Sequence, residues 1–214
     1  MPQNPLARAA IIFGAGLAIL ALGIASYLYL QPKPAINQAQ FDSNATGAQG
    51  SYGGPFTLTN DDGARVTNDT YAGRYLLIYF GYTFCPDVCP TSLSVMTQAL
   101  DRLESEAPKK AAAIQPLFIT VDPERDTVEV LNTYVDFFHP RLVGLTGSSE
   151  EIAGVTADYR IYAKKVTEEG ASDYLMDHTS AFVFLDPQGR FIRLFTHGTS
   201  AQEMADALAE VVKN

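Results

Sequence analysis

From residue 52 onwards, apolar runs and helically spaced apolar positions alternate along the chain. Short continuous apolar runs are typical of buried strands, and apolar residues three or four positions apart are typical of one helix face. By this rule we expect buried strands at Tyr75–Phe80, Pro116–Val121 and Val143–Leu145. The first of them leads into a helix whose inner face carries Leu93, Met96, Leu100 and Leu103. This order predicts an α/β fold with parallel strands.

Turn and capping residues mark the ends of further elements. Asn60–Gly63 and Asp186–Gly189 are turn sequences between apolar runs, so each predicts a β-hairpin. Ser148 and Ser200 each stand three residues before a glutamate, which is the capping-box pattern that opens a helix. Strands and helices therefore alternate, and a hairpin and a last helix follow. That order predicts a thioredoxin-like sandwich, with a central mixed sheet flanked by helices.

Two further segments carry weaker patterns. Asp126, with Glu129 three positions later, predicts a cap for a helix over Val128–Phe138. Residues 166–177 are polar and contain glycine, so we expect a loop there. Few of its residues bury apolar surface, and such a loop opens at low free-energy cost.

The N-terminal part of the chain has a different composition. Residues 11–30 form an uncharged run of 20 residues, and about 20 apolar residues span a bilayer core. A cleavable signal is the alternative, but its apolar stretch is usually about 7–15 residues long. We therefore expect an N-terminal tail (1–10), a transmembrane anchor (11–30), a flexible linker (31–51) and one folded domain (52–214).

Charges and thiols bear on where the folded domain lies. Arg8 precedes the apolar run and Lys33 follows it, which gives a small bias toward an inside N-terminus. A domain with paired thiols suits an oxidising compartment. The ten residues before the run contain one arginine, which is short for a mitochondrial presequence. The expectation is a bacterial inner membrane protein with a single span and a periplasmic C-terminal domain.

The charge of the chain excludes one class of partner. The 214 residues carry a net charge of −9, and the 33 N-terminal residues contribute only basic side chains to it. Binding to nucleic acid needs Lys and Arg against the phosphates. We therefore expect no nucleic-acid partner.

The chain has two cysteines, Cys85 and Cys89, where the first buried strand passes into a helix. Pro90 suits the first turn of that helix, where a backbone N–H is not needed. The free N–H groups and the dipole at a helix start favour a thiolate. A purely structural disulfide here would close a very short loop and stabilise the fold little. Redox exchange and metal binding both remain open.

The three histidines differ in their surroundings. His139 follows a predicted helix and His197 follows a predicted strand, so surface or capping roles are expected for both. His178 stands just before an apolar strand that can return to the sheet edge of the cysteines. Two thiolates and one imidazole would make a soft site that fits Cu(I) and also holds Cu(II). Zinc usually takes four ligands in structural sites.

Four blocks of sequence resemble the Sco/SenC family, copper-binding assembly factors of cytochrome c oxidase. They are Phe80–Pro90, Val121–Thr127, Leu142–Gly147 and Tyr174–Thr179, in the order found in the family. The resemblance runs from about Gly54 to the C-terminus. It implies a thioredoxin-like domain that binds one copper ion per chain, as Cu(I) or Cu(II).

By this resemblance the copper ligands are Cys85, Cys89 and His178. It implies a metallochaperone for the dinuclear copper site of cytochrome c oxidase subunit II, with an upstream donor still open. The alternative is a thiol–disulfide oxidoreductase that reduces the cysteines of that target through the redox pair Cys85 and Cys89. The Cys-x-x-x-Cys spacing and the lack of a proline before Ala181 favour copper, since thioredoxins resemble one another in Cys-x-x-Cys and such a proline. If the chain binds copper, we expect Cys85 and Cys89 to capture the ion first. His178 then joins the site, because it stands at the end of the polar segment that opens at low cost.

Overall fold

The computed structural model describes residues 52–167 and 173–213. The predicted tail, anchor and linker (1–10, 11–30 and 31–51) lie outside the described residues. Within the part of the chain that is described, no helix combines the length and the hydrophobicity needed to cross a membrane.

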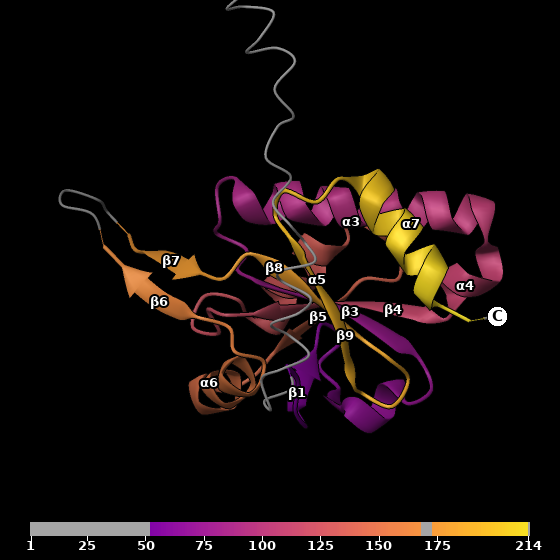
Figure 1. Cartoon of the computed structure of the whole chain (residues 1–214). Coiled ribbons are helices and arrows are strands. Elements are labelled where there is room, and N and C mark those ends of the chain that lie inside the picture. The colour runs from indigo at the N-terminus through magenta and orange to yellow at the C-terminus, as the bar shows by residue number, and fades with distance from the viewer. Residues whose placement is uncertain (1–51, 168–172, 214) are drawn as a thin grey trace, which may run out of the picture. The chain divides into compact units, whose positions relative to one another are not determined.

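The domain is built on one seven-stranded mixed sheet (Figure 1). Its strands are β1 (Thr57–Asn60), β2 (Arg65–Thr67), β3 (Tyr75–Gly81), β4 (Ile114–Thr120), β5 (Val143–Thr146), β8 (Ala181–Leu185) and β9 (Phe191–Thr196). Their order across the sheet is β2-β1-β5-β4-β3-β8-β9. Strands β3, β4 and β5 are parallel, and the outer strands pair antiparallel. The predicted central mixed sheet and the thioredoxin-like order of elements are confirmed.

Helices cover both faces of this sheet. They are the 3-10 helix η1 (Asn68–Tyr71) and the α-helices α3 (Val88–Glu106), α4 (Pro108–Ala112), α5 (Val128–Val135), α6 (Ser149–Asp158) and α7 (Ala201–Val211). Figure 1 shows α3 and α7 together on one side of the sheet and α6 on the other. Helix α3 packs against α7, and α5 packs against β5.

The position of the central strands in the core explains their continuous apolar sequences. Every residue of β3 and β4 is buried, because helices cover both faces of these strands. Tyr79, Phe80 and Phe118 fill the middle of the core without exposure to solvent. The predicted inner face of α3 is confirmed by its buried residues Leu93, Met96, Leu100 and Leu103.

The structure confirms most predicted helix starts and corrects one. Ser148 and Ser200 form the expected capping boxes with Glu151 and Glu203. The expected cap at Asp126 is wrong, because the side chain of Thr127 accepts the hydrogen bond from the backbone N–H of Val130. Asp126 is fully buried and has other partners, described below.

The end of this helix is also earlier than expected. Helix α5 ends at Val135 rather than at Phe138. Phe137, two residues after the end of the helix, is 79% exposed. The apolar residues beyond Val135 therefore do not form a buried helix face.

The predicted loop over residues 166–177 is partly wrong. Strand β6 (Ala163–Val166) pairs antiparallel with β7 (Leu175–His178), with Ala163 opposite His178 and Val166 opposite Leu175. This hairpin forms a separate two-stranded sheet and extends away from the main sheet in Figure 1. His178 therefore lies at the end of a strand rather than directly after a polar loop.

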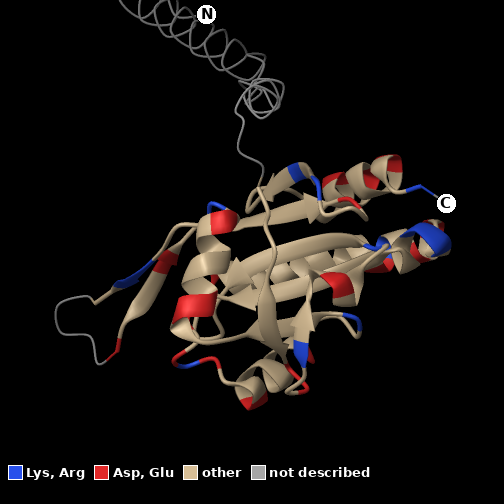
Figure 2. Cartoon of the chain, turned by 90° about the horizontal axis from the view of Figure 1, so that it is seen from below, with Lys and Arg blue, Asp and Glu red and all other residues tan. Residues whose placement is uncertain are grey.

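Charged side chains are spread over the surface of the domain. Figure 2 shows Asp and Glu on several helices and loops, with Lys and Arg between them. Acidic residues outnumber basic ones, at 24 to 15 in the whole chain.

Candidate metal centre

The two cysteines lie where β3 passes into α3. Cys85 is half-buried in the connecting loop, and Cys89 is fully buried in the first turn of α3. A Cβ atom on Gly81 would lie 2.9 Å from the Sγ of Cys89, so glycine at this position leaves room for the thiol. The backbone N–H of Cys89 donates to the Sγ of Cys85 at 3.4 Å. The helix start thus provides an N–H donor to one thiol, as the sequence predicts.

A buried carboxylate holds the cysteine loop in place. Asp126 accepts hydrogen bonds from the backbone N–H and the hydroxyl of Thr83, at 3.1 and 2.6 Å. It accepts a third from the hydroxyl of Thr120 at the end of β4, at 2.6 Å. Burial raises the pKa of this carboxyl, and the hydrogen bonds oppose that effect. Asp126 thus ties the loop that carries Cys85 to the adjacent strand of the main sheet.

His178 approaches the cysteines from the end of β7. Its Nε2 lies 3.4 Å from the Sγ of Cys89, and its Nδ1 lies 3.2 Å from the carbonyl oxygen of Thr179. A carbonyl oxygen only accepts, so the Nδ1 of His178 carries the proton that it donates. In the neutral ring, the lone pair of Nε2 therefore faces the buried thiol. The rings of Tyr79 and Tyr82 meet the imidazole edge-on and fix its plane.

The two thiols have opposite acidities. A hydrogen bond from Cys89 is the largest cause that lowers the pKa of Cys85, and together with backbone N–H groups it brings this pKa to about 3 against the opposing effect of burial. The hydrogen bond to Cys85, together with burial, raises the pKa of Cys89 above its ordinary value. The half-exposed thiol is thus the thiolate of the pair, and the buried thiol holds the shared proton.

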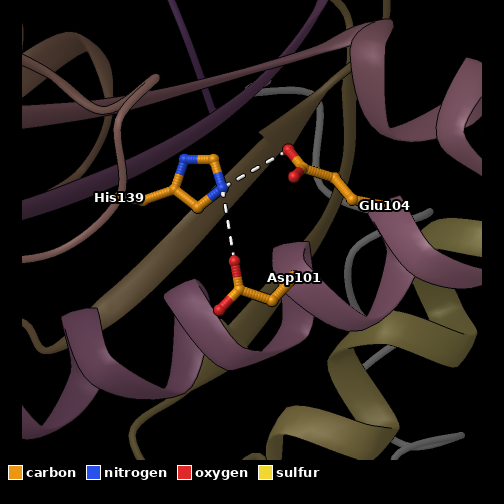
Figure 3. Close-up of side chains that lie close together, drawn as sticks. All are labelled: Asp101, Glu104 and His139. Atoms are coloured by element: carbon orange, nitrogen blue, oxygen red, sulfur yellow. Dashed lines mark ion pairs between the residues drawn. The ribbon is translucent and has the colours of Figure 1, made fainter.

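The other histidines lie elsewhere. His197 is exposed, with its Nδ1 3.1 Å from the hydroxyl of Ser92, which agrees with the expected surface role. Of the surface or capping role expected for His139, the surface role is wrong, because this residue is 2% exposed. Figure 3 shows the ring of His139 facing Asp101 and Glu104 of α3, with its Nε2 at 3.8 and 3.4 Å from their carboxylate oxygens.

One imidazole and two carboxylates resemble a cation site in residue type, but the hydrogen bonds around them do not suit one. The Nδ1 of His139 accepts a hydrogen bond from the backbone N–H of Arg141 at 3.2 Å, so the neutral ring carries its proton on Nε2. The guanidinium of Arg141 also donates twice to the oxygen of Glu104 that faces the ring, at 3.1 and 2.7 Å. The cluster joins α3 to the segment after α5.

The described domain is thus a thioredoxin-like α/β fold that brings two thiols and an imidazole nitrogen together beyond the carboxyl end of β3. The SCO1/SenC family model matches residues 44–213, and the chain belongs to this family.

Similar proteins agree with this assignment. Protein SCO1 homolog 1, mitochondrial, of Arabidopsis thaliana is 37% identical over 196 residues, which cover 89% of this chain and 58% of the relative. The chain thus spans little more than half the length of that relative. The crystal structure of Arabidopsis thaliana ScoI with copper bound is 41% identical, with a TM-score of 0.70, over 75% of this chain and 97% of that one. Bradyrhizobium japonicum ScoI with copper bound is 43% identical, with a TM-score of 0.67, over 75% and 99% of the two chains.

Proposed function

We propose that this chain is a copper metallochaperone. It binds one copper ion through the thiolates of Cys85 and Cys89 and the imidazole of His178. It passes this ion to the dinuclear copper site of cytochrome c oxidase subunit II. Copper-bound relatives and the blocks that resemble the Sco/SenC family support this proposal.

The observation that carries the proposal is the position of His178, whose Nε2 lies 3.4 Å from the Sγ of Cys89 while its Nδ1 faces the carbonyl oxygen of Thr179. Metal-binding histidines commonly donate their other ring N–H to a backbone carbonyl or a carboxylate, and Thr179 supplies that carbonyl. Thiolates select soft ions, and imidazole suits both oxidation states of copper. Loss of the shared proton from Cys89 would complete a site of two sulfur atoms and one nitrogen atom.

The half-exposed position of Cys85 fits an ion that is handed on. A thiol or imidazole of the acceptor can reach a copper ion at Cys85 without unfolding the core. Ligands of the acceptor would then replace those of this chain one at a time, with copper keeping its oxidation state. Cys89, buried in the first turn of α3, is the ligand that an acceptor reaches last.

We also propose that residues 11–30 anchor the chain in a bacterial inner membrane, with the described domain in the periplasm. The uncharged run of residues 11–30 and the pair of thiols support this. A reporter fused after Asn214 tests it. Activity of a periplasmic reporter is expected, and activity of a cytoplasmic reporter at that position would overturn the orientation.

The delivery step is tested by mixing the Cu(I)-loaded full-length chain with the reduced, copper-free domain of oxidase subunit II. After separation, copper should be found on the acceptor. Retention of all copper on this chain at equilibrium would contradict delivery to that target. The same mixture with the acceptor's cysteines alkylated is the matched control, and it should show no transfer.

A second function is supported by the different acidities of the two thiols. The thiolate of Cys85 would attack a disulfide of the target, form a mixed disulfide and release one target thiolate. Cys89 would then lose its proton, attack the Sγ of Cys85 and release the second target thiolate. The target gains two electrons, and this chain ends with a Cys85–Cys89 disulfide.

Copper-free reduced protein tests this reductase reaction. With an oxidised subunit II domain, the wild-type chain should become disulfide-bonded as the target becomes reduced. Cys89→Ser should instead accumulate a mixed disulfide through Cys85. An unchanged target in the presence of excess reduced chain would exclude the reductase function and leave the metallochaperone proposal intact.

A further inference from the structure

The hairpin that carries His178 has little core of its own. Strands β6 and β7 stand outside the seven-stranded sheet, and Met176 is their one buried residue. An isolated two-stranded hairpin is at best marginally stable in water. A cavity of about 270 Å³, lined in part by Tyr82 and Met176, lies beside this hairpin. Besides the rings of Tyr79 and Tyr82, which contact the imidazole, the position of His178 therefore depends on a small number of contacts at the two ends of the hairpin.

One end is held by backbone contacts. The N–H of Thr179 donates to the carbonyl oxygen of Tyr162 at 2.9 Å. The N–H of Tyr162 donates in turn to the hydroxyl of Thr179 at 3.1 Å. These bonds join the end of β7 to the start of β6, so they close the hairpin without attaching it to the cysteine loop.

The other end is held by the side chain of Arg125, which lies in the turn after β4. Its Nη1 donates to the carbonyl oxygen of Tyr174 at 2.9 Å and pairs with Asp173 at 3.3 Å. Its Nε donates to Asp122 at 2.5 Å, and the hydroxyl of Tyr174 donates to the other oxygen of Asp122 at 2.8 Å. Arg125 and Asp122 thus bind both the backbone and the side chain of Tyr174, just before β7.

The guanidinium of Arg125 also lies against an aromatic ring from each ligand-bearing segment. Its Cζ is 3.7 Å from the ring centroid of Tyr174 and 4.7 Å from that of Phe84. Phe84 immediately precedes Cys85, and Tyr174 stands four residues before His178. A planar guanidinium stacks on aromatic faces while its edge donates hydrogen bonds, which a lysine ammonium cannot reproduce.

Stability alone is a poor explanation for this residue. The Nη2 of Arg125 is buried and has no hydrogen-bond partner among the described residues. A buried donor without a partner costs free energy. The side chain nevertheless connects the hairpin to the turn whose next residue, Asp126, holds the cysteine loop through Thr83.

We propose that Arg125 is the positioning residue for His178. It sets the distance between the hairpin and the cysteine loop, and thereby the approach of the imidazole to the two thiols. The proposal rests on the function above, in which His178 is a copper ligand. Arg125 and Asp126 are neighbours in one turn that contains no copper ligand. Arg125 holds the hairpin that carries His178, and Asp126 holds the loop that carries Cys85.

Hydrogen exchange on the copper-free, reduced full-length chain tests the structural part. Arg125→Gln should speed exchange of the amides of β7 on the order of tenfold, because a hairpin contact is lost. Amides of β3 and β4 should exchange as before. The matched control is Arg141→Gln, a partly buried arginine that binds Glu104 and backbone carbonyls away from the cysteines. Unchanged protection of β7 in Arg125→Gln would overturn the proposal.

The Cu(II) spectrum tests the effect on the site. Arg125→Gln should shift the Cu(II) absorption and EPR signals toward those of His178→Ala, and His178→Ala should change the spectrum less in that background than in the wild type. Arg125→Lys, which keeps the charge, should give an intermediate spectrum, and Arg141→Gln should give that of the wild type. A wild-type spectrum in Arg125→Gln would overturn the proposal.

Two results separate this proposal from the function that it rests on. If His178→Ala itself leaves the Cu(II) spectrum unchanged, the ligand assignment fails, and exchange in the copper-free protein still decides whether Arg125 holds the hairpin. If Arg125→Gln does not fold, Tyr174→Leu removes the stacked ring and the hydroxyl bonded to Asp122 from the other side of the contact. It should speed β7 exchange in the same way, and wild-type protection would overturn the proposal.

Discussion

Two histidines of the described domain lie at the same distance from a ligand-type atom but present opposite forms of the ring. The Nε2 of His178 is 3.4 Å from the Sγ of Cys89, and the Nε2 of His139 is 3.4 Å from a carboxylate oxygen of Glu104. In the first, Nδ1 donates to the carbonyl oxygen of Thr179. In the second, Nδ1 accepts from the N–H of Arg141.

In a neutral imidazole, the group that is hydrogen-bonded to Nδ1 therefore determines whether Nε2 carries a proton. When Nδ1 donates to a carbonyl oxygen, the lone pair of Nε2 is free for a metal ion. When Nδ1 accepts from an N–H, the proton of the ring is on Nε2. By ligand type and distance alone, the clusters around His178 and His139 would be equally good candidates for a metal site. The hydrogen bond on the far nitrogen separates a candidate ligand from a structural histidine.

The largest difference between the two regions should appear in copper content. Replacing Cys85 and Cys89 together by Ser should remove nearly all copper from the reduced full-length chain, because a soft ion loses both thiolates. The double variant Asp101→Asn, Glu104→Gln should retain the wild-type content of about one copper ion per chain. Metal analysis after dialysis measures both. Undiminished copper in the double cysteine variant would refute the site.

The next difference is between the two thiols. In the reduced, copper-free chain, iodoacetamide should alkylate Cys85 first and leave the buried Cys89 largely unmodified. Since the pKa of Cys85 is lowered to about 3, its rate should stay nearly constant from pH 8 down to pH 5. An ordinary thiol would slow about tenfold per pH unit over that range. Mass spectrometry gives the site and the rate, and a steep fall below pH 8 would contradict a thiolate at Cys85.

A smaller effect is expected from the imidazole. His178→Ala should weaken Cu(II) binding more than Cu(I) binding, because two thiolates still hold Cu(I) in a linear arrangement. His139→Gln should leave both affinities unchanged and lower the midpoint of thermal unfolding, because it disturbs a buried contact with α3. Competition titrations with chelators measure the affinities. Equal loss of copper from the two variants would remove the distinction between the histidines.

The smallest effect concerns pH. Burial lowers the pKa of His139 from its ordinary value of 6.5, so below pH 6.5 the unfolded chain binds more protons at this residue than the folded chain. Stability should therefore fall as pH decreases below 6.5 and be independent of this residue at higher pH. His139→Gln should flatten this part of the stability curve. Denaturant unfolding from pH 5 to pH 8 measures it, and identical slopes in both proteins would contradict the assignment.

Local patterns predict the framework of this domain because its local and tertiary preferences agree. The runs at Tyr75–Phe80 and Pro116–Val121 are buried on both faces of the sheet and therefore carry apolar residues throughout. The capping boxes at Ser148 and Ser200 satisfy helix N–H groups within one turn. Elements whose stabilising contacts are all close in sequence are thus predicted well.

The sequence-based predictions are wrong where contacts between residues far apart in the chain determine the structure. Asp126 stands where a cap is expected, but its carboxylate is used by Thr83, 43 residues earlier in the chain. The loop predicted over residues 166–177 contains most of β7, whose partner β6 lies on the far side of a polar segment. His139 has a polar side chain but is buried by packing against α3. Each of these assignments needs the tertiary structure.

The candidate site divides in the same way. The spacing of Cys85 and Cys89 and their place before a helix are local features, so the sequence predicts them directly. His178 required the family resemblance, because it stands 89 residues from Cys89. The contribution of Arg125 was missed, although the block Val121–Thr127 that contains it resembles the family. The contacts that give this block a role come from Phe84 and Tyr174, on two other segments.

X-ray absorption at the copper edge of the Cu(I)-loaded full-length chain tests the central claim most directly. We expect a first shell of two sulfur atoms and one nitrogen atom with the outer-shell scattering of an imidazole. In His178→Ala the imidazole scattering should disappear while both sulfur atoms remain, and in His139→Gln the spectrum should match the wild type. A shell without sulfur, or imidazole scattering that is kept in His178→Ala and lost in His139→Gln, would refute copper binding by Cys85, Cys89 and His178.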